Sequence, residues 1–296
     1  MTYHSTRRTI LAGLAAGFAS THARAANTAA ADAMNGMRAQ IKAIEQRYGG
    51  RLGVAVVDSD SGVSVTHRSD ERFPMCSTFK LLAAAAVLKR VDQGTEKLGR
   101  NVPYGPGDLL SYAPVTKAHV ADGGMQLGDL CAAAIQWSDN TAANLMLQAI
   151  GGPAALTRYV RTLGDQVTRL DRTEPTLNTA LPNDNRDTTS PSAMLRTVRT
   201  ILLSQELSET SRRQLETWLI GDQVGGNRLR AGLPPAWRIG DKTGTGDNGT
   251  ANVVAIIWPP DRPPILATVY LTGSPAPADR LNLAHADVGR LIASNF

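Results

Sequence analysis

Apolar stretches at both ends of the chain predict strands. The first, Leu52-Gly53-Val54-Ala55-Val56-Val57, is continuous, and a polar turn at Asp60-Ser61-Gly62 separates it from the alternating Val63-Ser64-Val65-Thr66. A continuous stretch of this length is typical of a buried strand, and the short turn makes the second segment its hairpin partner. Glycine- and proline-rich turns separate three more such stretches near the C-terminus. The predicted strands are residues 51–58, 63–66, 237–243, 251–258 and 265–271.

The rest of the chain predicts helices. A helical pattern runs from Thr28 to Tyr48, where Gly49-Gly50 supplies a C-cap, and a final amphipathic pattern covers Ala276 to Ser294. Helix-like segments dominate residues 77 to 220. Strands at both ends with helices between them predict an α/β sheet domain that is built from both termini and interrupted by a helical insertion.

The first 25 residues have the organisation of an export signal. Arg7 and Arg8 precede a short apolar core from Ile10 to Ser20, and Ala23-Arg24-Ala25 offers a cleavage site. The apolar core is too short to span a bilayer. We therefore expect residues 1–25 to be a signal peptide of the twin-arginine type and the mature protein to be periplasmic, with no membrane attachment after its removal. The general secretory route is the alternative for export.

Composition and charge narrow the class of protein. The chain has 296 residues, 42% hydrophobic and 19% charged, as in a soluble globular protein with one large or two closely packed domains. The formal net charge is +5, but three of these charges lie in the leader, so the remainder carries +2. This bias is too weak to indicate binding to nucleic acid. The histidines outside the leader are isolated, which disfavours a zinc site.

One stretch carries candidate nucleophilic chemistry. Cys76-Ser77-Thr78-Phe79-Lys80 leads into an Ala- and Leu-rich run that is a strong helix former and apolar enough to be buried. Ser77 is therefore expected at the N-terminus of a buried helix, with Lys80 on the same face one turn later. A partly desolvated lysine can take the proton of a serine hydroxyl. The simpler interpretation is that Ser77 is an ordinary N-cap.

Two more polar motifs stand at the ends of predicted elements. Ser138-Asp139-Asn140 precedes an apolar helical pattern, where a Ser or Asp cap explains part of the motif. Lys242-Thr243-Gly244-Thr245-Gly246 ends a predicted strand, and a glycine there lets a substrate approach the backbone closely. A plain strand-to-turn junction is the alternative for the last motif.

In this order the three motifs, Ser-x-x-Lys, Ser-Asp-Asn and Lys-Thr-Gly, are the signature of class A serine β-lactamases and penicillin-binding proteins. Glu174-Pro175-Thr176-Leu177-Asn178 also matches the Glu-x-x-x-Asn of the class A omega loop. The chain resembles a class A β-lactamase from about residue 28 to its C-terminus. The resemblance implies an α/β fold with a five-stranded antiparallel sheet flanked by helices, plus an all-helical domain. It assigns residues 26–75 and 221–296 to the sheet domain and residues 76–220, with the omega loop, to the helical one.

The resemblance implies hydrolysis of β-lactam antibiotics through a serine acyl-enzyme, and hence antibiotic resistance. Ser77 would attack the lactam carbonyl, and its backbone N–H would form the oxyanion hole together with that of Thr245. Ser138 would relay a proton to the leaving nitrogen, and Asn140 would bind the side-chain amide of the substrate. No metal or organic cofactor is implied, and a monomer is expected.

Two residues compete for the role of base in acylation. Lys80 would have to be neutral, which burial and the nearby charge of Lys242 favour. The alternative is Glu174 acting through water, and the sequence leaves this open. In the second half of the reaction Glu174, held by Asn178, would activate the water that hydrolyses the acyl-enzyme. The resemblance also implies a cis bond before Pro175 that helps turn Glu174 inward.

The carboxylate of the substrate needs a cationic pocket. Many class A enzymes place an arginine on the strand after Lys-Thr-Gly, but that position is Ala251 here. We expect Arg228 to replace it, as in relatives that supply the arginine from the preceding segment. Tyr112 matches the aromatic residue at the mouth of the cleft, although a core or surface tyrosine is an alternative. The other substrate-binding residues that the resemblance implies are Lys242, Thr243, Gly244 and Thr245.

Further matches concern the omega loop and the two cysteines. Arg172 and Asp187 match the ion pair that pins the loop. From the sequence alone, Cys76 and Cys131 are compatible with a disulfide or with two separate buried thiols. The positions that hold a partner cysteine in related enzymes are Gly246 for Cys76 and Ala84 for Cys131, so the resemblance implies two free, buried thiols.

Two other functions share the three motifs. One is a D-alanyl-D-alanine carboxypeptidase or transpeptidase, and the other is a non-enzymatic penicillin-sensing domain that stays acylated. Glu174 with Asn178 argues against both, because a sensor lacks an efficient deacylating base, and the absence of a predicted anchor argues in the same direction.

Overall fold

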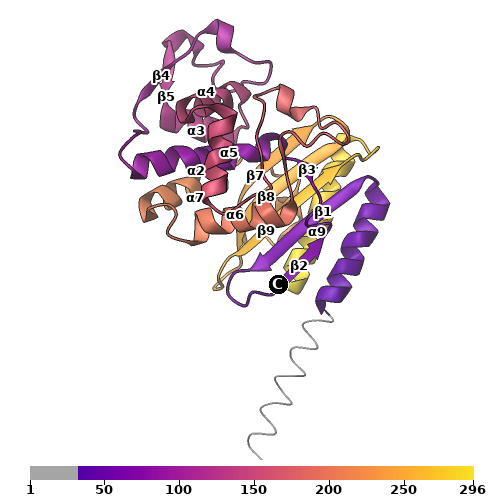
Figure 1. The fold of residues 1–296 in the computed structure, drawn as a ribbon. Helices are drawn as coiled ribbons and strands as arrows, with labels where there is room; N and C mark the ends of the chain where they lie inside the picture. Colours follow the sequence, from indigo (N-terminus) through magenta and orange to yellow (C-terminus); the bar gives the residue numbers. More distant parts are fainter. Residues whose placement is uncertain (1–32) are drawn as a thin grey trace, which may run out of the picture.

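The computed structural model describes residues 33–296 (Figure 1). The predicted leader lies outside the described residues, as does the predicted start of the first helix at Thr28. Within the described part this helix covers residues 33–48 and ends at Gly49 and Gly50, both with positive φ angles (70° and 78°). The predicted glycine C-cap is confirmed, since glycine adopts this left-handed backbone without steric strain.

All five predicted strands form one antiparallel sheet with the order β2-β1-β9-β8-β7. The N-terminal hairpin therefore joins the last strand of the chain, and β7 lies at one edge. The observed bounds differ from the predicted ones by at most three residues. The strands are β1 (Arg51–Asp58), β2 (Ser64–His67), β7 (Arg238–Gly246), β8 (Thr250–Trp258) and β9 (Ile265–Thr272).

Helices fill the middle of the chain and its C-terminus. They are α2 (Phe79–Asp92), α3 (Leu127–Gln136), α4 (Asn140–Ile150), α5 (Gly152–Thr162), α6 (Pro191–Leu203), α7 (Glu209–Ile220), α8 (Leu229–Gly232) and α9 (Ala278–Asn295). Two short antiparallel pairs were not predicted, β3 (Phe73–Pro74) with β6 (Thr188–Thr189) and β4 (Asn101–Pro103) with β5 (Gly124–Gln126). Single 3₁₀ turns are η1 (Cys76–Thr78), η2 (Pro106–Asp108), η3 (Val120–Asp122) and η4 (Thr176–Asn178).

Two hydrophobic cores cover opposite faces of the sheet. Along β8, Val253, Ala255 and Ile257 belong to the core shared with the N-terminal helix and α9, whereas Val254 and Ile256 belong to the core shared with the middle helices. This is the period-two alternation of a strand that is buried on both faces. Figure 1 shows the middle helices gathered on one side of the sheet. The predicted fold class is confirmed, and we propose the domain division 26–75 with 221–296 against 76–220.

Helix α2 is the centre of the helical region. Its residues from Phe79 to Leu88 are all buried, and it contacts α3, α4, α5 and α7. Small alanine side chains let neighbouring helices approach α2 closely. Lys80 lies in the first turn of this buried stretch, and its side chain is fully buried.

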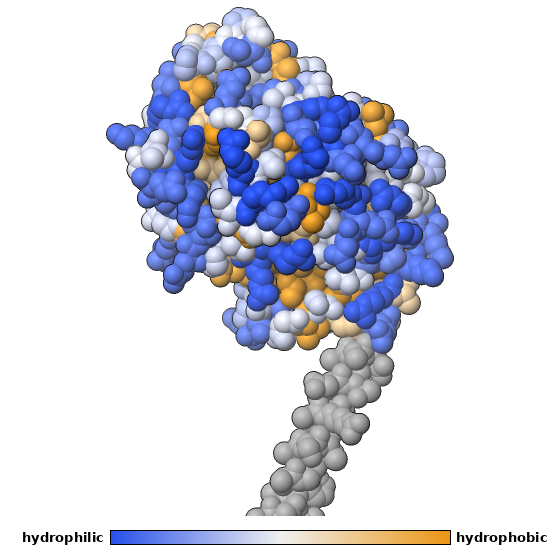
Figure 2. All heavy atoms as spheres, viewed as in Figure 1, coloured by the Kyte–Doolittle hydropathy of each residue, from blue (hydrophilic) through white to orange (hydrophobic). Residues whose placement is uncertain are grey.

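The outer surface is mainly hydrophilic on the face shown in Figure 2, with smaller apolar patches. Among the described residues the exposed large apolar side chains include Tyr112, Trp137 and Leu181. Between residues 33 and 296 no helix is both long enough and apolar enough to cross a membrane.

The two cysteines are buried and free, as the resemblance implied. Cys76 Sγ faces the glycine that replaces its partner, since a Cβ at Gly246 would lie only 2.6 Å from the sulfur. Burial raises the pKa of both thiols, so they remain protonated and unreactive in the folded protein.

Thiol titration should show this directly. Unfolded, unreduced protein is expected to react with two equivalents of a thiol reagent, because unfolding exposes both sulfurs. The native protein should react with almost none over the same time. Finding no thiol in the unfolded protein would show a disulfide instead.

Candidate active site

Ser77 lies where β3 turns into α2. It forms the middle of η1, at the N-terminal end of the buried helix, as predicted. Cys76 before it has a positive φ angle of 45°, which is uncommon for a residue with a side chain. Ser77 Oγ donates a hydrogen bond to Glu174 Oε1 at 3.1 Å. The serine is therefore in direct contact with a carboxylate that can accept its proton.

Lys80 is surrounded by acceptors. Its Nζ lies 2.8 Å from Ser138 O, 2.7 Å from Asn140 Oδ1 and 3.0 Å from Glu174 Oε1. An ammonium has three N–H donors, so each has an acceptor here. Burial lowers the pKa of Lys80, and the Glu174 carboxylate opposes this shift. The contacts favour the charged form of Lys80.

Ser138 lies between the two lysines. Its Oγ is 3.1 Å from Lys242 Nζ and 3.4 Å from Lys80 Nζ. Burial, together with the charge of Lys80, lowers the pKa of Lys242 to about 7. A hydroxyl in contact with two lysines can receive a proton from one side and pass it to a substrate on the other.

Glu174 is held from both its backbone and its carboxylate. It is buried, the peptide bond to Pro175 is cis as the resemblance implied, and Asn178 Nδ2 donates to Oε2 at 2.5 Å. Asn144 makes a reciprocal pair with the Glu174 backbone, since Nδ2 donates to Glu174 O and Glu174 N donates to Oδ1, both at 3.0 Å. The carboxylate therefore points inward, toward Ser77.

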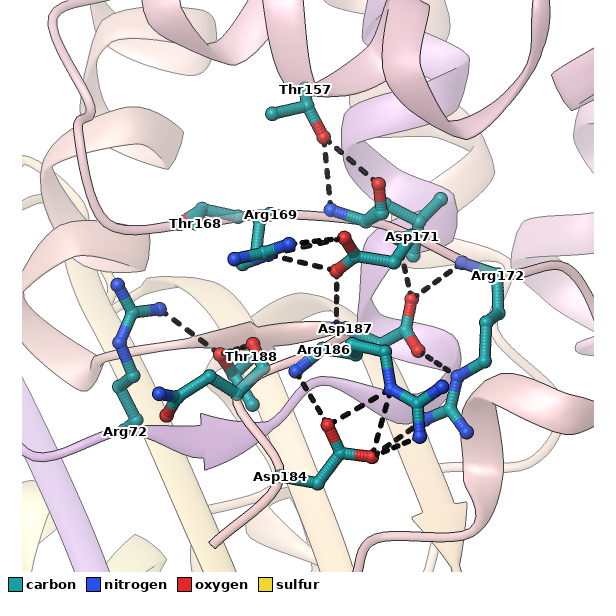
Figure 3. Close-up of polar contacts among 12 residues, drawn as sticks. Arg72, Thr157, Thr168, Arg169, Asp171, Arg172, Asp184, Arg186, Asp187 and Thr188 are labelled. Carbon is teal, nitrogen blue, oxygen red and sulfur yellow. Dashed lines mark hydrogen bonds and ion pairs between the residues drawn. The ribbon is translucent and has the colours of Figure 1, made fainter.

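The buried carboxylate of Asp187 joins the two ends of the omega loop, which we call its neck (Figure 3). Asp187 accepts hydrogen bonds from the backbone N–H groups of Asp171 and Arg172, at 2.7 and 2.9 Å, and from Arg172 Nε at 2.5 Å. In return Asp187 N donates to Asp171 Oδ2 at 3.0 Å. The predicted ion pair of Arg172 and Asp187 is confirmed. It closes the loop that carries Glu174.

These segments border one cleft, which opens beside Ser77. Lys80, Glu174 and Lys242 do not line the cleft themselves, but each contacts Ser77 or Ser138, which do. The residues that line the cleft are Ser77, Tyr112, Ser138, Asn140, Asn178, Val224, Arg228, Thr243, Gly244 and Thr245. All twelve residues predicted for the site are therefore brought together.

Comparison with known proteins agrees with this arrangement. Residues 36–296 match the model of the β-lactamase enzyme family. The β-lactamases Toho-1 of Escherichia coli and CTX-M-8 of Citrobacter amalonaticus are each 45% identical over 262 residues, which is 88% of this chain and 90% of theirs. The chain belongs to the class A β-lactamases.

Solved structures of the class show the same fold. An ancestral class A β-lactamase (GNCA) superposes with a TM-score of 0.87 at 58% identity, over 88% of this chain and 100% of that one. The putative class A β-lactamase PenP from Rhodopseudomonas palustris has a TM-score of 0.86 at 53% identity, with the same coverage.

In this β-lactamase a buried arginine stands behind the Lys-Thr-Gly strand. Arg228 Nη2 donates to Thr245 Oγ1 at 2.6 Å, Nη1 donates to Gly244 O at 2.7 Å, and Nε donates to Asn282 Oδ1 at 2.9 Å. All these acceptors are neutral. Burial lowers the pKa of Arg228 to about 10, so the guanidinium is still charged at neutral pH. Its charge is not cancelled by a contacting carboxylate among residues 33–296, and it lies at the predicted anion pocket.

Two residues that hold the site were not assigned a role from the sequence. Asp139 is the N-cap of α4, as the simpler interpretation had it, but its buried carboxylate also accepts from Val115 N and Thr116 N at 3.0 and 2.9 Å. It thus fixes the loop that carries Tyr112, whose carbonyl accepts from Asn140 N. Asn144, the partner of the Glu174 backbone, lies on α4 together with three other polar side chains, so no pattern in the sequence marked it.

The described histidines, His67, His119 and His285, do not line the cleft of the β-lactamase. His285 is buried in α9, where burial lowers its pKa to about 3 and keeps it neutral. Within residues 33–296 no cluster of three His, Cys, Asp or Glu side chains is placed to hold a metal ion.

Proposed function

We propose that this β-lactamase opens β-lactam antibiotics through an ester on Ser77, with Glu174 as the base in both halves of the reaction. The observation that carries the proposal is the contact of Ser77 Oγ with Glu174 Oε1. A general base has to lie within hydrogen-bond reach of the proton that it removes, and Glu174 does.

The contacts of Lys80 support Glu174 rather than Lys80 as the base for acylation. Every N–H of a Lys80 ammonium finds an acceptor, and one of these acceptors is Glu174 itself. A neutral lysine would lose part of this bonding. Lys80 therefore acts as a fixed cation that contacts the Glu174 side chain and orients Ser138 and Asn140.

Acylation then follows from these positions. Ser77 Oγ bonds to the lactam carbonyl carbon as its proton moves to Glu174, and the backbone N–H groups of Ser77 and Thr245 stabilise the oxyanion. When the carbon–nitrogen bond breaks, Ser138 gives its proton to the ring nitrogen. Lys242, 3.1 Å from Ser138 Oγ, is the nearest donor that can replace this proton.

Deacylation uses the same carboxylate on a water molecule. Glu174 and Asn178 lie in contact beside Ser77, and among the described residues Asn178 Oδ1 is buried without a protein partner. Before this step the proton that Glu174 took from Ser77 returns to Lys242 by way of Lys80 and Ser138, so that Glu174 is again a carboxylate. Water held beside Glu174 then gives it a proton and attacks the ester, and Ser77 Oγ takes this proton as it leaves. The deacylated product leaves with the ring open, which gives resistance to the antibiotic.

A turnover experiment tests the proposal against its alternatives. Purified protein should hydrolyse a chromogenic cephalosporin continuously, and Ser77→Ala should not. A single burst equal to the enzyme concentration would indicate a penicillin sensor. Cleavage of a D-alanyl-D-alanine peptide, together with stalling on the cephalosporin, would indicate a carboxypeptidase.

Arg228 supports the recognition of the substrate carboxylate. Because its charge reaches the cleft at Thr245, Arg228→Ala should raise KM for penicillins by about 10-fold, the equivalent of about 1.4 kcal/mol of charge-assisted hydrogen bonding. Arg228→Lys keeps the charge without the planar fork and should show a smaller effect. Steady-state kinetics of both variants measure this, and an unchanged KM in Arg228→Ala would remove Arg228 from the pocket.

The destination of the protein belongs to the proposal as well. The pattern of residues 1–25 supports export to the periplasm, with the twin-arginine route as the finer proposal. Replacing Arg7 and Arg8 with lysine should abolish the appearance of mature protein in the periplasm if that route is used. Continued export would point to the general secretory route. We also propose that the mature enzyme is a monomer.

A further inference from the structure

We propose that Asn252 is a positioning residue for acylation. Its buried carboxamide fixes the turn that carries Ser77 relative to strand β7 and so sets the geometry of the oxyanion hole. The inference rests on the proposed function, because it takes the N–H groups of Ser77 and Thr245 as the donors of that hole.

Asn252 sits at the junction between the sheet and the nucleophile. It is fully buried on β8, opposite Gly244 of β7 on one side and Tyr270 of β9 on the other. Its Nδ2 donates to Pro74 O at 2.9 Å and to Met75 O at 3.1 Å. These two carbonyls are the last ones before Cys76 and Ser77.

The segment that Asn252 holds is under strain. The positive φ of Cys76 costs a residue with a side chain of order 1–3 kcal/mol, and such a conformation persists only where its surroundings fix it. Met75 O also accepts from Thr78 N at 3.2 Å and from Thr78 Oγ1 at 2.8 Å, within the same turn. Asn252 supplies the donor that comes from the sheet and so ties this turn to a rigid element.

Strand β7 carries Thr245, the second donor of the oxyanion hole, and it is linked to the backbone carbonyl of Asn252. Arg228 Nη1 donates both to Asn252 O at 2.8 Å and to Gly244 O at 2.7 Å, next to Thr245. Strand β7 also packs directly on the nucleophile turn, since a Cβ at Gly244 would lie 2.8 Å from Met75 O. Asn252 therefore contacts the nucleophile turn with its side chain and strand β7 with its main chain.

The sheet alone does not require an amide at this place. The next five residues of β8, Val253 to Ile257, are all apolar and buried. An amide buried there is costly unless it is bonded. Both hydrogen bonds that Nδ2 donates go to the nucleophile segment, whereas Oδ1 has no partner among the described residues. An apolar residue would pack well in the core, but it could not donate the two hydrogen bonds that hold the nucleophile segment.

Asn252→Leu tests the proposal, with Thr250→Val as the matched control. Thr250 lies on β8, two residues earlier and on the same face, and its buried hydroxyl bonds to Thr272 Oγ1 at 2.7 Å, away from the nucleophile. Both variants lose a buried polar contact, so both should lose thermal stability. Only Asn252→Leu should misplace the oxyanion hole.

Two measurements separate the two roles. The acylation rate constant of Asn252→Leu should fall about 10- to 100-fold, because displacements of about 1 Å in an active site have effects of this size, while substrate affinity changes little. In the Glu174→Gln background, the infrared carbonyl band of the trapped ester should move to higher frequency, since its hydrogen bonds become weaker. Thr250→Val should leave both quantities unchanged.

An unchanged carbonyl band in Asn252→Leu, or the same shift in Thr250→Val, would overturn the proposal and leave Asn252 a purely structural residue. If Asn252→Leu does not fold, Asn252→Ser, which retains one donor, should give an intermediate band position, and an unshifted band would be equally negative. If Glu174→Gln alone accumulates no ester, the proposed function fails instead, before any variant of Asn252 is measured.

Discussion

The Glu174→Gln variant is expected to remain attached to a penicillin after one reaction. Glutamine keeps the shape of the side chain but cannot accept a proton, so the water beside the ester is not activated. General base catalysis contributes about 10²- to 10⁴-fold, and kcat should fall by an amount in this range. Acylation should slow as well, because the same group takes the proton of Ser77, but the strained ring of the drug is more reactive than the ester that it forms.

Intact-mass spectrometry checks this result. After incubation with a penicillin, the variant should carry the mass of one drug molecule, and the wild type should return to its free mass. The double variant Ser77→Ala/Glu174→Gln is the matched control and should carry no adduct. A Glu174→Gln protein that turns over at the wild-type rate would exclude Glu174 as the base.

Loss of Asp187 should have the largest effect on stability. In Asp187→Ala, Arg172 and two backbone N–H groups lose their common acceptor at the neck of the omega loop. Breaking a buried pair by removing one partner typically costs about 3–5 kcal/mol. Because a domain of this size loses about 2–4 °C for each kcal/mol, the melting temperature should fall by roughly 6–20 °C. Activity should fall too, since the loop carries Glu174.

A neighbouring carboxylate provides the control for that experiment. Asp184 lies at the same neck (Figure 3), but it pairs with the exposed Arg186 and only distantly, at 3.8 Å, with Arg172. Exposed pairs are worth about 0–1 kcal/mol, so Asp184→Asn should change the melting temperature by a few degrees at most. Equal losses in Asp184→Asn and Asp187→Ala would show that the buried tie at Asp187 has no special role.

The sequence predicts the sheet well because its strands are decided by local pattern. β1 and β8 are continuous apolar runs bounded by turns, and such runs fit a strand with both faces covered. The pairs β3 with β6 and β4 with β5 were not predicted, because a strand of two or three residues is too short to show an alternation of apolar and polar side chains. They form because the surrounding chain brings them together.

The site could be predicted to the extent that its residues occur in motifs. Ser77, Ser138 and Lys242 stand in short motifs that occur in a characteristic order along the chain and whose residue types indicate their chemistry. Glu174 could be assigned from its spacing to Asn178. The supporting residues Asn144 and Asn252 have no such pattern. Asn144 is one of several polar residues on α4, and Asn252 is the one carboxamide on β8. Their partners lie 30 and 177 residues away in the chain. Only the folded arrangement shows what these amides hold.

The pairing of β1 with β9 also governs how the enzyme can be made. Arg51 lies opposite Thr272, so the first strand to leave the ribosome has to wait for the last one before its second edge is covered. Such distant pairing slows folding and leaves apolar strands open to association with other chains meanwhile. A nascent chain that stops before residue 265 would lack the strand that joins β1 to β8. The newly synthesised polypeptide can therefore complete its sheet only after residues 265–272 have been made.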